Sequence, residues 1–287
     1  MGCRDASSRA YPGTMNAGKL RVVDDVSPAD WIAPRLSGRF GAVGLTIPRG
    51  FSAYARIFHP AESSPGDATR WATVASATGR EAHALMQWDS IVAPTDRNGA
   101  IAGSWNGVGP SRGDLDHVAL RALCRRLAVG QRDEPECFFC LWEGYGELAS
   151  YGWLRRPAAP GSRVAPEQRH LFTASQLESA RLSLPRRTYV VLSGSLLHAL
   201  LIGSFACGTF WPKSPNLFWP VDHAWCVATE IDFDSTLVGG SDTLIAAIVD
   251  DPALEAWPIG PDASLASDAD EVNRVAPGTP GSRCQGE

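Results

Sequence analysis

Residues 210–241 read FWPKSPNLFWPVDHAWCVATEIDFDSTLVGGS. An aromatic, proline-containing segment leads into a run in which apolar and other residues alternate. Side chains on a strand point alternately to its two faces, so residues 224–234 are predicted to form a strand with one core face and one acidic face. The predicted core residues are Trp225, Val227, Ile231 and Phe233, and the acids are Glu230, Asp232 and Asp234.

Three acids on one strand face would lie about 7 Å from their neighbours, the rise of two residues. Such carboxylates repel one another unless arginines, a metal ion or bulk water neutralise them. Carboxylate oxygens are also the ligands that Mg²⁺, Mn²⁺ and Ca²⁺ prefer. Two hypotheses follow for Glu230, Asp232 and Asp234: they pair with arginines, or they form a divalent-cation site.

The sequence DFDSTLV at residues 232–238 resembles the first motif of haloacid-dehalogenase-type phosphotransferases. The resemblance implies Asp232 as nucleophile, Asp234 as acid and base, and a Mg²⁺ ion between them. Ser235 stands where that motif has glycine, and no lysine follows it in the chain. An Asp-x-Asp metal clamp of the nucleotide-sugar transferase kind fits the same spacing. These motifs make a metal-dependent hydrolase or transferase the alternative function.

The aromatic part of the stretch predicts a different activity. Trp211, Trp219 and His223 are candidate ligand-binding residues because aromatic rings offer a large contact area for a planar ligand, a sugar or a protein. The competing interpretation is that these rings pin a proline-rich loop to the core. The first interpretation predicts a non-enzymatic module that presents an aromatic loop to a ligand or a protein partner.

Charge is distributed unevenly along the chain. The formal net charge is −5, yet no lysine or arginine occurs between Ser214 and Asn273, a segment with twelve acidic residues. This pattern predicts either a basic or metal partner for the acidic part, or arginines from the preceding residues that cover it. No basic patch with interleaved aromatics is found, which argues against nucleic-acid binding.

Cysteine usage and hydropathy bear on the compartment. Seven cysteines, an odd number, and an N-terminus without an apolar signal region predict a reducing cytoplasm. Residues 188–212 carry no formal charge, but their glycines, serines and His198 argue against a membrane span. They predict a buried strand followed by a buried helix. Cys137 and Cys140 fall on opposite faces of a predicted strand, which favours buried thiols over a metal pair.

With 287 residues, 44% apolar and 20% charged, the chain has an ordinary globular composition. We expect an α+β fold in which a mixed or mainly antiparallel sheet packs against helices. A single domain is predicted at 19–275, with a possible lobe boundary at 155–169, a disordered segment at 1–18 and a flexible tail at 276–287. Strands are predicted at 41–47, 52–59, 137–143, 189–193 and 254–257, and helices at 114–129, 173–182 and 243–249.

Several phrases together resemble a family of uncharacterised hypothetical proteins from actinobacteria. They are SAYARIFHPA (52–61), RWATVA (70–75), CFFCLWEGYG (137–146), RTYVVLSGSL (187–196) and residues 214–241 of the opening stretch. The resemblance spans about Ser27 to Asn273 and implies one structural unit from a GC-rich source. It implies no activity, cofactor or site.

Overall fold

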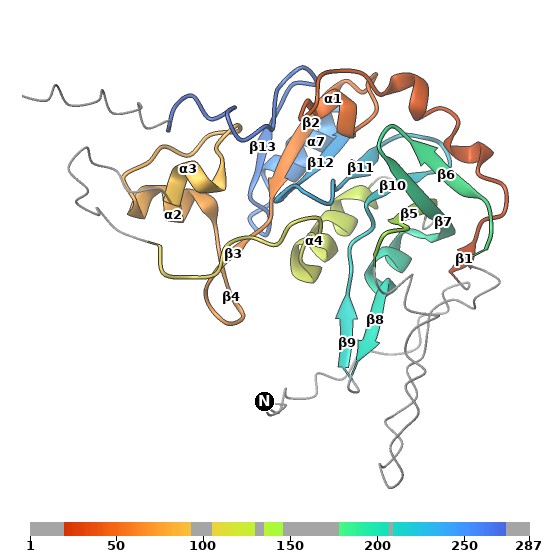
Figure 1. The fold of residues 1–287 in the computed structure, drawn as a ribbon, viewed down its shortest axis with the longest axis horizontal. Helices are drawn as coiled ribbons and strands as arrows, with labels where there is room; N and C mark the ends of the chain where they lie inside the picture. Colours follow the sequence, from red (N-terminus) through yellow and green to blue (C-terminus); the bar gives the residue numbers. More distant parts are fainter. Residues whose placement is uncertain (1–19, 93–104, 130–134, 146–177, 207–208, 274–287) are drawn as a thin grey trace, which may run out of the picture.

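The computed structural model describes residues 20–92, 105–129, 135–145, 178–206 and 209–273. Its centre is a nine-stranded sheet in which every pairing is antiparallel (Figure 1). Eight strands follow in spatial order, and β6 (Arg181–Leu184) pairs with β7 beside β1. The eight are β1 (Arg21–Val22), β7 (Arg187–Ser195), β5 (Glu136–Trp142), β10 (Leu217–Pro220), β11 (Cys226–Ala228), β12 (Ser235–Gly240), β2 (Ala53–Phe58) and β13 (Ala256–Pro258).

One face of the sheet is covered by α4 (His117–Leu127), the 3-10 helix η4 (Leu196–Leu201) and α7 (Asp242–Val249). Asp116 caps α4 because its Oδ1 accepts the backbone N–H groups of Val118 and Ala119. The apolar face of α4 explains its position. Its buried residues are Ala119, Leu120, Ala122, Leu123, Cys124 and Leu127.

The other face is covered by the N-terminal segment and a C-terminal loop. The segment holds two 3-10 helices, η1 (Ser27–Ala29) and η2 (Ala33–Arg35), and the short helix α1 (Val43–Thr46). The backbone N–H of Val43 donates to the carbonyl of Ala263, which ties the two segments together. This second core buries residues from both ends of the described chain and from the sheet, among them Ile32, Val43, Ile47, Trp219 and Leu265.

A third cluster lies beside β2 and contains α2 (Trp71–Ala77) and α3 (Trp88–Val92), preceded by the hairpin β3 (Ala61–Ser64) and β4 (Asp67–Thr69). The N-cap residue of α2, Arg70, makes no side-chain capping hydrogen bond. The carboxylate of Glu255 accepts the N–H groups of Trp71 and Ala72, at 2.6 and 2.7 Å.

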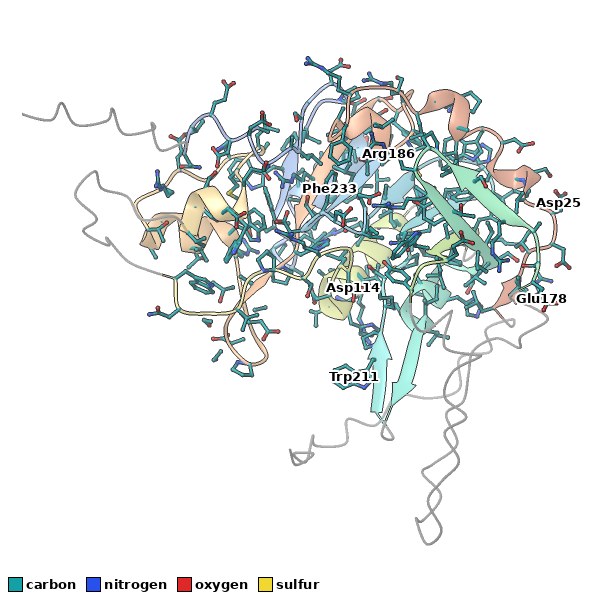
Figure 2. All side chains as sticks on the ribbon, viewed as in Figure 1. Asp25, Asp114, Glu178, Arg186, Trp211 and Phe233 are labelled. Atoms are coloured by element: carbon teal, nitrogen blue, oxygen red, sulfur yellow. The ribbon has the colours of Figure 1, made fainter. Side chains whose placement is uncertain are left out.

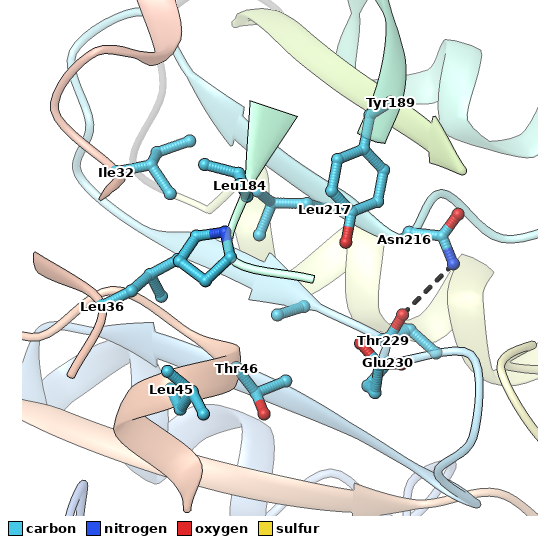
Figure 3. A pocket seen from close by; sticks show the side chains of 12 residues that line it. Ile32, Leu36, Leu45, Thr46, Leu184, Tyr189, Asn216, Leu217, Thr229 and Glu230 are labelled. Carbon is cyan, nitrogen blue, oxygen red and sulfur yellow. Dashed lines mark hydrogen bonds between the residues drawn. The ribbon is translucent and has the colours of Figure 1, made fainter. Parts of the chain in front are cut away.

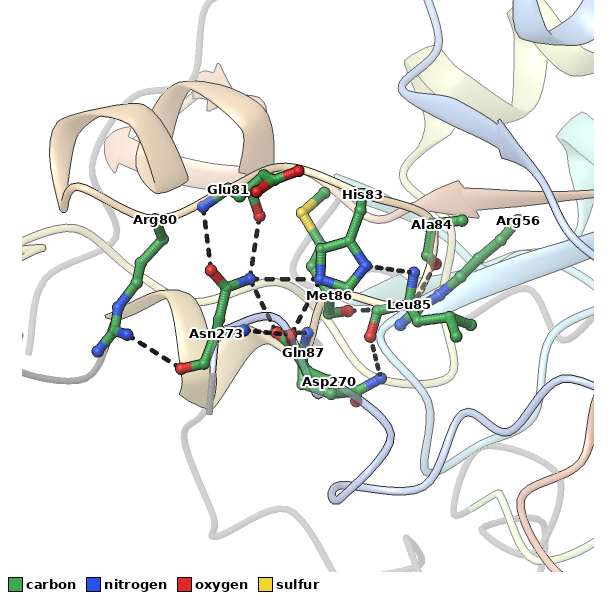
Figure 4. Close-up of polar contacts among 10 residues, drawn as sticks. All are labelled: Arg56, Arg80, Glu81, His83, Ala84, Leu85, Met86, Gln87, Asp270 and Asn273. Carbon is green, nitrogen blue, oxygen red and sulfur yellow. Dashed lines mark hydrogen bonds and ion pairs between the residues drawn. The ribbon is translucent and has the colours of Figure 1, made fainter. Parts of the chain in front are cut away.

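A buried polar network fastens the C-terminal segment to this cluster (Figure 4). Asp270 accepts hydrogen bonds from His83 Nε2 at 2.9 Å and from the backbone of Gln87 at 3.1 Å. Asn273 donates from its side chain to Asp270 and to the carbonyl of Glu81. Because Asp270 and Asn273 are buried, these bonds satisfy groups that would otherwise destabilise the fold.

The α+β prediction is confirmed, as are the helices near 114–129 and 243–249 and the strands near 52–59, 137–143, 189–193 and 254–257. The strand predicted at 41–47 is wrong, because Val43–Thr46 forms α1. The helix predicted through Leu182 is wrong in its described part, where 181–184 form β6. The predictions for 1–18, 155–169 and 276–287 lie outside the described residues.

Residues 188–212 form β7 and η4, as the sequence predicted in outline, and then a separate hairpin. This hairpin consists of β8 (Gly203–Ala206) and β9 (Thr209–Pro212). It forms a two-stranded sheet of its own, and Figure 1 shows it projecting from the body of the molecule.

Candidate functional site

The three acids of residues 230–234 do not share a strand face. β11 ends at Ala228, and residues 229–234 form the connection to β12, which begins at Ser235. The predicted long strand is therefore wrong beyond Ala228. Trp225 and Val227 are buried as predicted, whereas Ile231 and Phe233 are half-buried.

Glu230 and Asp232 share one arginine. Arg187 Nη2 lies 2.7 Å from Glu230 Oε1 and 2.8 Å from Asp232 Oδ2. The guanidinium also lies over the ring of Trp142, with its carbon 5.6 Å from the ring centroid. Desolvation acts to lower the pKa of Arg187, but hydrogen bonding and the charges of Glu230 and Asp232 outweigh it and raise the pKa.

Asp234 faces a different arginine. Its Oδ1 lies 3.6 Å from Nη2 of Arg56, whose side chain is 1% exposed. Arg56 donates hydrogen bonds to the Ser235 hydroxyl at 2.9 Å and to the carbonyls of Ala84 and Met86, both at 3.0 Å. Burial lowers the pKa of Arg56 to about 10, so the guanidinium remains charged at neutral pH. Burial also disfavours the charged form of Asp234 and so raises the pKa of this carboxyl, although the charge of Arg56 opposes the effect.

The first of the two hypotheses for the acids therefore describes the structure. The three carboxylates are paired with two arginines. Within the described ranges, no group of three or more histidine, cysteine, aspartate or glutamate side chains is arranged to hold a metal ion. Asp232 and Asp234 pair with separate arginines, which is not the arrangement that the phosphotransferase-like motif implies.

Other acids of the C-terminal segment are covered in the same way. Asp251 lies 2.6 Å from Arg126, and Asp262 lies 2.6 Å from Arg49. Five of the twelve acids in residues 214–273 thus pair with arginines from earlier parts of the chain.

The structure separates the candidate ligand-binding residues. Trp219 is fully buried and stacks on Phe138, with ring centroids 5.7 Å apart. His223 has a positive φ of 55° and stacks on Trp31 at 4.5 Å. Trp211 belongs to β9 and is 59% exposed (Figure 2). Trp211 and Trp219 therefore do not share a surface, since one ring belongs to the core and the other faces solvent.

A buried chain of polar groups runs behind the acidic connection. His59 Nδ1 lies 2.7 Å from the carbonyl of Ser111, which can only accept, so Nδ1 carries the proton. Nε2 then accepts from the Thr236 hydroxyl at 2.9 Å, and Thr236 accepts from Thr229 at 2.8 Å. Burial lowers the pKa of His59 to about 4, in keeping with a neutral ring. Every member is satisfied, so the chain stabilises this tautomer.

A small cleft lies in front of the same connection (Figure 3). Its cavity volume is about 30 Å³, enough for a water molecule or a small polar group. Glu230, Thr229 and Asn216 line one side, and Tyr189 points its hydroxyl into the space. The remaining lining is mostly apolar: Ile32, Leu36, Leu45, Thr46, Leu184, Pro185, Leu217 and Ala228.

Asn216 sets the geometry of the cleft by joining three strands. Its Oδ1 accepts the backbone N–H of Trp142 at 2.9 Å, at the end of β5. Its amide donates to the Tyr145 hydroxyl at 2.7 Å and to the carbonyl of Thr229 at 3.2 Å. Sequence reasoning missed Asn216 and Tyr189. Neither stands in a recognisable motif, and only the pairing of β5, β7 and β10 brings them together.

No protein-family model, curated protein or solved structure matches the chain. The resemblance to actinobacterial hypothetical proteins and the cytoplasmic location therefore stay predictions. The described helices are all too short or too polar to cross a membrane.

Proposed function

We propose that this protein is a non-enzymatic binding module that engages a protein partner through the β8–β9 hairpin. The observation that carries the proposal is Trp211, a large aromatic residue left 59% exposed on a projecting strand. Tryptophan is among the side chains that most often dominate the binding energy of protein interfaces.

The hairpin also leaves backbone groups open to a partner. Neither β8 nor β9 pairs with another described strand. Residues 203–212, GSFACGTFWP, contain no charged side chain that would discourage pairing at the edge. An isolated two-stranded hairpin is only marginally stable in water, so an added strand from a partner would stabilise it. Trp211 would then fill a pocket on that partner.

The base of the hairpin is held firmly, which supports presentation of Trp211 from a fixed position. Lys213 N–H donates to the carbonyl of Ile202 at 2.9 Å. The next residue, Ser214, donates its N–H to Asp114 at 2.7 Å and accepts the N–H of Leu115 at 2.9 Å. A pre-organised contact residue loses less entropy on binding.

Photo-crosslinking tests the proposal. The residue p-benzoylphenylalanine is placed at position 211 in the native host, and as a matched control at Val129, which is 74% exposed at the end of α4. We expect a discrete crosslinked protein from position 211 and none from position 129. Mass spectrometry identifies the partner, including a second copy of this chain. Trp211→Ala should weaken its co-purification by at least about tenfold.

Stability measurements keep the test interpretable. Trp211→Ala should change the free energy of unfolding by less than about 0.5 kcal/mol, as for an exposed residue. Trp219→Ala should cost about 3–5 kcal/mol, as for a core aromatic residue. The proposal fails if Trp211→Ala destabilises the protein like Trp219→Ala, or if positions 211 and 129 give the same crosslinks.

A further inference from the structure

We propose that the cleft between Tyr189 and Glu230 is a binding site for a primary ammonium group carried on a short alkyl chain. The site is separate from Trp211 and is built by β7, β10 and the connection after β11 on one side, and by η2 and α1 on the other.

Tyr189 is the first observation that indicates a ligand. Its side chain is buried, with the residue 8% exposed, and its hydroxyl points into the cleft (Figure 3). No described residue hydrogen-bonds to this hydroxyl, and its oxygen is reached by solvent through the cleft, so it is open to a group that enters there. Burial raises the pKa of Tyr189, followed in effect by the charge of Glu230, so the hydroxyl remains neutral. A bound polar group would replace solvent as the partner of this hydroxyl.

Glu230 determines the sign of the ligand's charge. Both hydrogen bonds from Arg187 end on the same oxygen, Oε1, at 3.2 Å from Nε and 2.7 Å from Nη2. Within the described residues, Oε2 accepts no hydrogen bond and is available to the cleft. Glu230, Asp232 and Arg187 together carry a formal charge of −1, which favours a cation over a neutral or anionic group.

The size and lining of the cleft determine the rest of the ligand. A volume of about 30 Å³ matches a group of the size of one ammonium. Leu36, Leu45 and Leu184 form the apolar part of the lining and would contact an alkyl chain leaving the cavity. An ammonium group has three donors, which match Glu230 Oε2, the Tyr189 hydroxyl and a water molecule at the mouth.

Butylammonium, butanol and butyrate are the probes that test this proposal, with binding followed by backbone amide chemical shifts. We expect saturable shifts near Tyr189, Thr229 and Leu184 with butylammonium, half-complete at a concentration on the order of 1 mM. Butanol and butyrate should bind at least about tenfold more weakly. A parallel titration uses Nα-acetyl-lysine methylamide, which places the ammonium-bearing side chain between two peptide groups. Binding of both compounds indicates that the cleft can accept a lysine side chain of a partner. Binding of butylammonium alone indicates that the peptide groups clash and that the ligand is a free amine.

Three variants locate the binding. Glu230→Gln should weaken butylammonium binding at least about tenfold, and Tyr189→Phe about fivefold, because it removes only the hydroxyl. Asp242→Asn makes the same charge change at the exposed start of α7, away from the cleft lining, and should alter binding less than about threefold. The proposal is overturned if no shifts occur at 20 mM, a limit set about twentyfold above the expected midpoint, if butanol gives the same shifts, or if Glu230→Gln and Tyr189→Phe bind like the wild type.

Discussion

Arg56 and Arg187 both neutralise acids of the short connection between β11 and β12, but Arg56 is buried and Arg187 is partly exposed to solvent. Arg56 is 1% exposed and donates its hydrogen bonds to Ser235 and two backbone carbonyls. Its Nη2 lies 3.6 Å from Oδ1 of Asp234. Arg187 is 23% exposed and contacts Glu230 and Asp232 directly. A buried guanidinium must be fully satisfied to be tolerated, whereas a half-exposed one shares its carboxylates with water. We therefore expect the closer ion pair to contribute less to stability.

The largest effect is expected from Arg56→Met. The change leaves Asp234 without its guanidinium and removes the donors to the carbonyls of Ala84 and Met86. We expect a loss of about 3–5 kcal/mol in the free energy of unfolding, measured by urea titration. The double variant Arg56→Met, Asp234→Asn should recover part of that loss. A loss below about 1 kcal/mol would contradict the role assigned to Arg56.

A pH effect of somewhat smaller size is expected at His59, which burial and the nearby charge of Arg56 keep neutral. The unfolded chain takes up a proton below pH 6.5, but the folded protein does so only near pH 4. Stability is therefore fully present above pH 6.5 and falls by about 3 kcal/mol as the pH is lowered to 4. Urea titrations across this range should show a shallower decline for His59→Gln. Equal slopes would refute the prediction.

Arg187→Met tests the exposed side of the comparison. Water can solvate Glu230 and Asp232 once the guanidinium is gone, so we expect a loss of about 1 kcal/mol or less. Raising the salt concentration to 1 M should shrink this loss, because salt screens exposed pairs. The loss in Arg56→Met should hardly change with salt. A similar salt dependence for both variants would remove the distinction between them.

The smallest effect is expected from Asp232→Asn. Asp232 is 67% exposed on its side chain, and Arg187 keeps Glu230 as a partner. The melting temperature should shift by less than about 2 °C. A larger shift in differential scanning calorimetry would mean that the three charges act as one cooperative network.

The fold was largely predictable where periodicity is strong. The heptad-like apolar face of α4 and the dense apolar run of β5 correspond to what the structure shows. Cys137 and Cys140 do fall in different cores, as the period of two required. The segment 41–47 misled because its few apolar residues suit either a strand or a turn of helix, and contact with Ala263 decides for the helix.

The candidate site was less predictable, because its partners lie far apart in the sequence. The alternation that marks a strand continues through Glu230 and Asp232, yet the backbone turns there. Gly113 approaches so closely that a β-carbon would lie 2.6 Å from the Cα of Ile231, and its N–H donates to the carbonyl of Phe233. The sequence of residues 224–234 does not predict the contact with Gly113. The sequence also does not show that Trp211 is exposed and Trp219 is buried, because both stand in the same tripeptide, FWP, at 210–212 and 218–220.

The position of β2 has a consequence for synthesis of the chain. β2 pairs with β12 on one edge and with β13 on the other. Phe58, for example, pairs with Ser235, which is synthesised much later. Both of its edges therefore stay open on the ribosome until nearly the whole protein has emerged. During that interval an apolar strand can pair with a strand of another nascent chain. Slow translation or loss of the segment that contains β12 should accordingly favour aggregation at β2, and chaperone binding there would protect the growing chain.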